Sequence, residues 1–317
     1  MSSMYLAVDS GGSKTIWRVL NEVGETLTSM TTEGMASVFP GKLPVGEYCT
    51  KAYETISRYG TPKKIYVSLG GPNTEEVAEA LKAFWRDLPV TVGREASGDC
   101  MLAAAAYMGC SGVVLCGTGS TAVGIKDGRR CYAGGWGPVY GDEGSGGGIG
   151  KQALCLFLQS LNGTGRPCGL SPLFDELTTG LDPTQFADRM EVKKRAINIS
   201  RRDLGKLAPK VYELAVDGIQ EAAGLYQEAA QQIAVLAADV CDDTPEAAVL
   251  LCGGFLRNKP LLLEQCRACF QKLSHARLVY DEAFDPIVAA SVSVLEQGGI
   301  RITNEIFKNI LNEKGVK

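Results

Sequence analysis

The sequence of 317 residues contains a single histidine, His275, in the segment LSHARLVY. That segment is typical of a turn leading into a strand, where a surface or core position explains the residue without chemistry. One histidine argues against a histidine base and against a histidine-rich metal site. Proton transfer, if the protein performs any, therefore falls to carboxylates.

Other absences narrow the class of protein further. Lys and Arg number 32 against 36 Asp and Glu, so the net charge of −4 gives no electrostatic footprint for nucleic acid. The first residues, MSSMYLAVDS, lack the basic segment and long apolar run of a signal peptide. No stretch reaches about 18 uninterrupted apolar residues, so no membrane partner is expected. The eleven scattered cysteines are typical of a reducing compartment, and we expect a cytoplasmic protein.

What is abundant is glycine, with 38 residues, many of them between Gly109 and Gly150. Glycine residues are concentrated where the backbone must come close to a ligand or to another part of the chain. The chain length favours two domains of roughly 150 residues each. A hydrophobic fraction of 45% with 21% charged residues is ordinary for a globular protein.

The first glycine turn lies in AVDSGGSKTIWRVL, residues 7–20. It is not a P-loop, because Ser13 separates Gly12 from Lys14 and the residues that follow favour a strand over a helix. The stretch therefore predicts a β-hairpin. Asp9, at the end of its first strand, would face whatever the turn holds.

The pattern restarts near residue 113. SGVVLCGTGSTAVGIKDGRR again predicts strand, glycine turn and strand, which indicates a structural duplication. Alternating helices and strands precede it, residues 150–245 are mostly helical, and AAVLLCGGFLRN predicts a buried strand before a Gly-Gly turn. A last helix starts with Asp285 as N-cap and closes at Gly298.

Three motifs carry a family resemblance. The order of the two hairpins and the strand–Gly-Gly–helix unit resembles the superfamily of sugar kinases, actin and heat-shock ATPases. VLCGTGST, GGWGPVYGDEGSGGGIGKQAL and ASGDCMLAAAA resemble the N-acetylglucosamine kinase branch of the BadF/BadG/BcrA/BcrD ATPase family. The resemblance covers most of the chain and is weakest between about residues 165 and 245.

The resemblance implies an α/β fold of two ribonuclease H-like (actin-like ATPase) domains, with a nucleotide and sugar cleft between them. The first domain would comprise residues 1–112 and a C-terminal helix, 286–317, that returns to it. The second would comprise residues 113–285, with a helical insertion at about 165–245.

The resemblance also implies ATP and Mg²⁺ as cofactors. Asp9 would hold Mg²⁺, through water, since Mg²⁺ keeps several waters and few carboxylates. Glycine turns supply backbone N–H groups to phosphate oxygens. The implied ATP-binding residues are Gly11, Gly12, Ser13, Lys14, Thr15, Gly117, Thr118 and Gly119, with Gly253 and Gly254 for adenine and ribose.

The family's catalytic aspartate falls on Asp99, which would accept the proton of the attacking sugar hydroxyl; helix capping by Ser97 and Asp99 is the alternative. Asp142 would accept hydrogen bonds from other hydroxyls, and Glu143 would orient that loop or contact an acetamido group. Trp136 would pack on the sugar's apolar face or anchor a small core. The implied sugar-binding residues are Ser37, Gly71, Asp99, Ser120, Thr121, Trp136, Asp142 and Glu143.

Two departures from the family pattern affect the sugar side. No Asn occurs between residues 22 and 72, where Ser37 is the nearest polar group, and Thr121 replaces an Asn found in vertebrate-like members. An amino-sugar kinase acting on O6 of N-acetylglucosamine is thus expected, with N-acetylmuramic acid and glucosamine left open. A homodimer is expected, serving cell-wall recycling or uptake.

Two other functions found among related proteins fit the sequence less well. The dehydratase activators of the superfamily carry an iron–sulfur cluster between subunits, and Cys266 and Cys269 form the one CxxC pair. Their helical setting favours burial instead. A sugar-sensing regulator would bring a DNA-binding segment, and a zinc-bearing sugar kinase a Cys-x-Cys-Gly cluster; the sequence shows neither.

Overall fold

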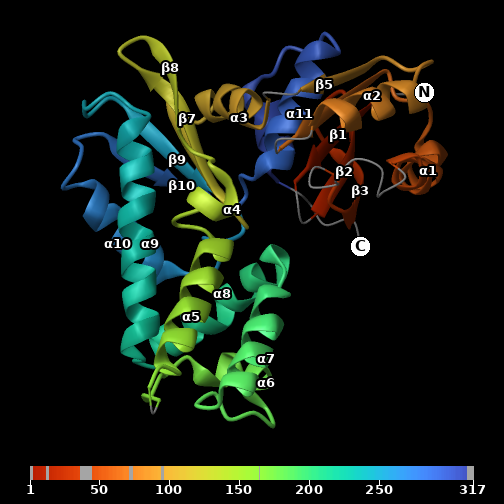
Figure 1. Ribbon diagram of the computed structural model, residues 1–317. Coiled ribbons are helices and arrows are strands. Elements are labelled where there is room, and N and C mark those ends of the chain that lie inside the picture. Colours follow the sequence, from red (N-terminus) through yellow and green to blue (C-terminus); the bar gives the residue numbers. More distant parts are fainter. Residues whose placement is uncertain are drawn as a thin grey trace. The chain divides into compact units, whose positions relative to one another are not determined.

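The computed structural model describes residues 3–11, 14–35, 45–70, 74–93, 96–163 and 165–312 (Figure 1). The chain divides into two compact units. The first unit consists of Met1–Ser111 and Asp281–Lys317, so the end of the chain returns to the unit that contains its beginning. The second unit is Gly112–Tyr280. Each unit contains one mixed sheet, and the α/β fold is as predicted.

The sheet of the first unit has the strand order β3-β2-β1-β4-β5. The first three strands are an antiparallel meander, and β4 and β5 run parallel to β1. The strand that follows the first glycine turn is β2, which confirms the predicted hairpin. The strands are β1 (Met4–Ser10), β2 (Lys14–Asn21), β3 (Thr26–Glu33), β4 (Lys64–Leu69) and β5 (Val90–Gly93).

Helix α11 is the central helix of the first unit, because it packs on β1, β4 and α3 and is buried from Ile287 to Leu295. The expected single helix over 286–317 is instead two helices. Gly298 and Gly299 end α11, and Gly299 has a φ of +85°. The helices are α1 (Val45–Ile56), the 3₁₀ turn η1 (Ser57–Tyr59), α2 (Thr74–Phe84), α3 (Ala96–Ala106), α11 (Pro286–Gln297) and α12 (Asn304–Leu311).

The sheet of the second unit repeats the topology of the first, with the order β10-β9-β6-β7-β8. Its first three strands are again an antiparallel meander, and β9 and β10 are parallel to β6. The predicted structural duplication is therefore present. The strands are β6 (Gly112–Cys116), β7 (Ser120–Lys126), β8 (Arg129–Gly134), β9 (Ala248–Cys252) and β10 (Arg277–Tyr280).

The helices of the second unit form one large core with its sheet. α9 packs against α10, and α5 packs against α8 (Figure 1). Small and apolar residues of α9, from Ala222 to Ala237, face that core. The helices are α4 (Gly137–Tyr140), α5 (Gly146–Ser160), η2 (Ser171–Leu173), α6 (Asp175–Thr178), α7 (Phe186–Ile197), α8 (Arg201–Val216), α9 (Gln220–Asp239) and α10 (Pro260–Phe270).

Candidate functional site

Two glycine turns lie side by side at the carboxyl ends of two neighbouring strands of the second sheet. β6 and β9 run parallel, so Gly117–Gly119 and Gly253–Gly254 follow their strands at the same edge. The N–H of Phe255 donates to the carbonyl of Cys116 at 3.0 Å. Gly253 has a φ of +107°, and a Cβ there would collide with that carbonyl. The structure thus brings together two turns predicted to bind the nucleotide.

The N-terminus of α5 lies against the same turn. The N–H groups of Gly146 and Gly147 donate to the carbonyls of Gly117 and Thr118, at 2.9 and 3.0 Å. A Cβ on Gly147 would collide with the Thr118 carbonyl. The helical region expected over residues 150–245 starts earlier, at Gly146, where close approach of the backbone requires glycine. The N–H of Gly148 donates to the Ser145 hydroxyl at 3.1 Å, so these first N–H groups are used within the protein, and the helix end contributes its partial positive charge to the turn.

Some of the groups predicted to bind phosphate form hydrogen bonds within their own turns instead. The N–H of Gly117 donates to the carbonyl of Gly119 at 2.8 Å. The N–H of Gly11 donates to the carbonyl of Lys14 at 3.0 Å. Thr15 is fully buried, and its hydroxyl lies 2.9 Å from that of Ser10. These groups shape the turns. Gly12 and Ser13 lie outside the described residues.

Asp142 is held in place by three contacts. It is 4% exposed and has a φ of +67°, uncommon for a residue other than glycine. Its Oδ1 accepts the N–H of Ser120 at 3.3 Å, and its Oδ2 lies 2.5 Å from Nη2 of Arg201. The hydroxyl of Ser145 donates to its carbonyl at 2.6 Å. Two predicted sugar-binding residues, Asp142 and Ser120, are therefore adjacent to each other and to the glycine turn.

The remaining predicted sugar residues of this unit lie in strand β7 and in the segment from Trp136 to Glu143 that contains Asp142. The Ser120 hydroxyl donates to the carbonyl of Glu143 at 2.5 Å, and the Glu143 side chain is exposed. Thr121 begins its pairing with β8 opposite Gly134. The side chain of Trp136 is no core anchor, because the residue is 77% exposed. Ser37 and Gly71 lie outside the described residues.

In the first unit, the end of β1 places Asp9 beside a second carboxylate. Burial, and after it the charge of Asp285, raises the pKa of Asp9 to about 7, although the charge of Lys14 opposes the shift. Asp285 immediately precedes α11 but makes no capping hydrogen bond with its side chain. Its proximity to Asp9 was missed, because an Asp-Pro pair before a helix is typical of an N-cap.

Asp99 belongs to the neighbourhood of Asp9. Ser68 pairs with Asp9 across β1 and β4, and its hydroxyl lies 3.7 Å from the Sγ of Cys100, the residue after Asp99. Burial raises the pKa of Cys100 to about 11, and the charge of Asp9 contributes to the shift. Because α3 begins at Ala96, Asp99 lies inside its first turn and not at the N-cap. Asp99 itself is half-buried.

A buried ammonium lies near the Gly253–Gly254 turn. The Nζ of Lys259 stands 5.5 Å from the ring centre of Phe255 and 5.7 Å from that of Tyr212. The residue is 6% exposed, and burial lowers the pKa of its ammonium. This cluster was not predicted, because Tyr212 comes from α8, in the region where the family resemblance is weakest.

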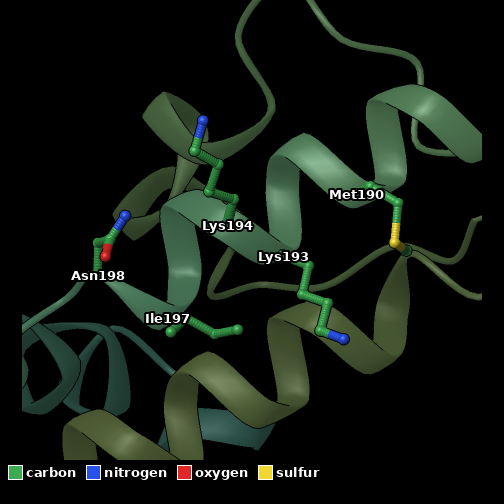
Figure 2. A pocket seen from close by; sticks show the side chains of 5 residues that line it. All are labelled: Met190, Lys193, Lys194, Ile197 and Asn198. Atoms are coloured by element: carbon green, nitrogen blue, oxygen red, sulfur yellow. The ribbon is translucent and has the colours of Figure 1, made fainter.

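A surface hollow and a buried cysteine elsewhere among the described residues are not assigned to the candidate site. A shallow hollow of about 250 Å³ on α7 is lined by Met190, Lys193, Lys194, Ile197 and Asn198, and Figure 2 shows the two lysines extending in different directions. Cys266 is fully buried in the core of the second unit. Within the described ranges, no cluster of three or more His, Cys, Asp or Glu residues is placed to hold a metal ion. In that part of the chain, no helix is long and apolar enough to cross a membrane.

The two sheets define the actin-like ATPase fold, as comparison with solved structures shows. A candidate N-acetylglucosamine kinase from Chromobacterium violaceum superposes with a TM-score of 0.66 at 21% identity, covering 93% of this chain and 99% of the other. A glucokinase of the ROK family from Streptomyces griseus, crystallised with glucose and AMPPNP, gives a TM-score of 0.57 at 16% identity, covering 93% and 100%.

The sequence itself identifies the family. The profile of the BadF/BadG/BcrA/BcrD ATPase family matches residues 6–272, and the chain belongs to that family, as its glycine motifs predicted. A curated relative, the N-acetylmuramic acid/N-acetylglucosamine kinase of Clostridium acetobutylicum, is 25% identical over 187 residues. That match spans 56% of this chain and 60% of the relative.

Proposed function

We propose that the protein is an ATP-dependent amino-sugar kinase that phosphorylates a hydroxyl, at O6, of an N-acetylhexosamine. The observation that carries the proposal is the contact between Asp142, Ser120 and the Gly117–Gly119 turn. A carboxylate suited to hold a sugar hydroxyl is fixed next to a turn suited to hold phosphate. An enzyme that only hydrolysed ATP would not need such an acceptor group there.

The reaction would follow from groups on both units. The sugar hydroxyl loses its proton to Asp99 as its oxygen attacks the γ-phosphorus, and the bond from that phosphorus to the bridging oxygen breaks, which releases ADP. Asp142 accepts a hydrogen bond from another hydroxyl of the sugar and orients it. The indole of Trp136, exposed in this structure, is available to cover the apolar face of the sugar ring.

The acidic residues of the first unit fit a divalent cation. Burial, and after it the charge of Asp285, raises the pKa of Asp9, and a cation held by these two carboxylates would offset both effects. Asp9 would hold Mg²⁺ through water, and Asp285 is placed to assist. When bound, Mg²⁺ neutralises charge on the β- and γ-phosphate oxygens. Lys14, whose charge acts on Asp9, would supply a further cation to the phosphates.

The relative from Clostridium acetobutylicum supports an N-acetylated sugar as acceptor, since its name gives N-acetylmuramic acid and N-acetylglucosamine. Glucosamine is the alternative acceptor. An activator ATPase with an iron–sulfur cluster is disfavoured, because Cys266 has no exposed surface and its thiol packs in the core. A cluster shared between subunits requires exposed thiolates.

ADP release with a panel of sugars tests the proposal. Purified protein with Mg-ATP is assayed with N-acetylglucosamine, N-acetylmuramic acid, glucosamine, N-acetylmannosamine and glucose. We expect slow release without sugar and a many-fold increase with an N-acetylhexosamine. Release that is equal with every sugar and without sugar would contradict the proposal, and iron bound in stoichiometric amounts would favour the activator.

A further inference from the structure

Arg201 is the first residue of α8, and it places a positive charge where a helix favours negative charge. The 16-residue helix starts after Ser200, whose hydroxyl accepts the N–H of Asp203 at 3.1 Å. The N-terminal end of a helix carries partial positive charge, which Asp203 complements and Arg201 opposes. Residues that break a local rule of this kind are concentrated at functional sites.

The guanidinium of Arg201 lies directly against the Gly117–Gly119 turn. Its Nη2 pairs with Oδ2 of Asp142 at 2.5 Å, across 59 residues of sequence. A Cβ on Gly119 would collide with both this Nη2 and Oδ1 of Asp142. The side chain of Arg201 is 41% exposed, whereas that of Asp142 is 5% exposed. A ligand at the turn can therefore reach the guanidinium from solvent.

The position of Arg201 is fixed by close helix packing. A Cβ on Gly150 of α5 would collide with the carbonyl of Leu204 in α8, and the Cα of Gly205 faces the side chain of Thr118. The N-terminal ends of α5 and α8 therefore both lie against the Gly117–Gly119 turn. Two helix N-termini and one guanidinium favour a strongly anionic group at that point, and Asp142 is the carboxylate next to them.

We propose that Arg201 binds the γ-phosphoryl group of ATP during its transfer, an inference that rests on the proposed kinase function. Within the described residues, Nη2 is the guanidinium nitrogen that has a partner, so the Nε and Nη1 donors of this partly exposed side chain are available to a ligand. A planar guanidinium suits two oxygens of one phosphoryl group. Asp142 holds the guanidinium of Arg201 beside the Gly117–Gly119 turn, and it also binds the sugar. The γ-phosphoryl group and the sugar hydroxyl that receives it are thereby brought together.

The affinities for Mg-AMPPNP and Mg-ADP, measured by titration calorimetry without sugar, test this role. The two nucleotides differ at the terminal phosphoryl group, so their affinity ratio reports contacts to it. We expect Arg201→Met to weaken AMPPNP binding by roughly 10–100-fold, the size of a lost charge-assisted contact, and to leave ADP binding nearly unchanged. Arg201→Lys should recover part of the loss. Arg202→Met, which removes the adjacent exposed guanidinium, is the matched control and should keep the wild-type ratio.

The variant Arg201→Met leaves Asp142 buried without its partner and is open to misfolding. The double variant Arg201→Met/Asp142→Asn removes both charges and should show the same loss of AMPPNP relative to ADP. An affinity ratio in both variants equal to that of Arg202→Met would overturn the proposal. A raised sugar KM with an unchanged ratio would also overturn it, since Arg201 would then only position Asp142. A wild-type protein that phosphorylates no sugar would instead refute the kinase function, and the affinity ratio would still decide the role of Arg201.

Discussion

Asp9 and Asp285 are separated by most of the chain, yet the charge of Asp285 raises the pKa of Asp9. The pairing arises because the segment from Asp281 onward returns to the first unit and α11 packs on β1. Burial makes the larger contribution to the shift, and together these effects bring the pKa of Asp9 to about 7. A carboxyl group whose pKa lies near 7 in the folded protein makes the free energy of unfolding depend on pH.

The stability of the metal-free protein should fall as pH rises from about 4 to 7. Asp9 titrates near 3.8 in an unfolded chain and near 7 in the folded protein, so the folded state binds the proton more tightly across this interval. Asp9→Asn removes the buried charge. In EDTA at pH 8, this substitution should raise the Tm by about 2–4 °C for each kcal/mol gained in the free energy of unfolding. At pH 4 it should not raise the Tm.

The control for that experiment is Asp87→Asn, which changes an exposed aspartate of the same unit. It should alter the Tm little at either pH. Mg²⁺ at pH 8 should raise the Tm of the wild type and of Asp87→Asn, but not that of Asp9→Asn. An equal response to Mg²⁺ in all three proteins would remove Asp9 from the metal site.

Asp99→Asn keeps the shape of the side chain and removes the proposed base. Turnover should fall by roughly 10²–10⁴-fold, the usual contribution of general base catalysis. Nucleotide affinity should be retained, because Asp99 is not among the groups proposed to hold the phosphates. Steady-state kinetics and calorimetry on the same preparation check both parts. Unchanged turnover, or loss of nucleotide binding in a folded protein, would show that Asp99 has another role.

Asp142→Asn should raise the KM for the sugar more than that for ATP, because the amide oxygen of Asn can still accept a hydrogen bond from Arg201. A lost hydrogen bond to a charged acceptor is worth about 1.5–3 kcal/mol, or roughly 10–150-fold in KM. Asp127→Asn is a matched control, because Asp127 is an aspartate with a φ of +51° in the same unit, exposed in a hairpin turn. Equal kinetics for the two variants would exclude Asp142 from the sugar site.

The hairpins, and with them the fold class, were readable from local sequence. A glycine turn followed by β-branched and bulky apolar residues predicted β2 and β7, and both are present. The start of α5 was not predicted, since Gly146–Gly150 opposes helix formation by propensity. Those glycines are needed for contact with Thr118 and Leu204, residues that local patterns do not connect to them.

The parts of the candidate site that were missed depend on distant packing. Arg201 lies in the helical region where the family resemblance is weakest, and nothing in its surroundings indicates a pair with Asp142. Asp285 satisfied the pattern of an N-cap, so no second role was sought. In both cases the chemistry depends on a partner supplied by a segment far along the chain, which a reading of local spacing does not locate.

Domain closure is expected if both glycine turns bind one nucleotide. The units would rotate about hinges near residues 111–112 and 280–281, where the chain passes from one unit to the other, and closure would exclude water from the phosphoryl group. Small-angle scattering should give a smaller radius of gyration with sugar and AMPPNP together than without ligands. Equal radii under verified saturation would contradict the closure.

The identity of the phosphorylated product tests the central claim most directly. Phosphorus NMR of the protein with Mg-ATP and N-acetylglucosamine, with N-acetylmuramic acid in a parallel sample, distinguishes transfer from hydrolysis. The account predicts ADP together with a phosphate monoester whose phosphorus couples to the two protons on C6 of the sugar. Inorganic phosphate as the sole product, formed at the same rate with and without sugar, would contradict it.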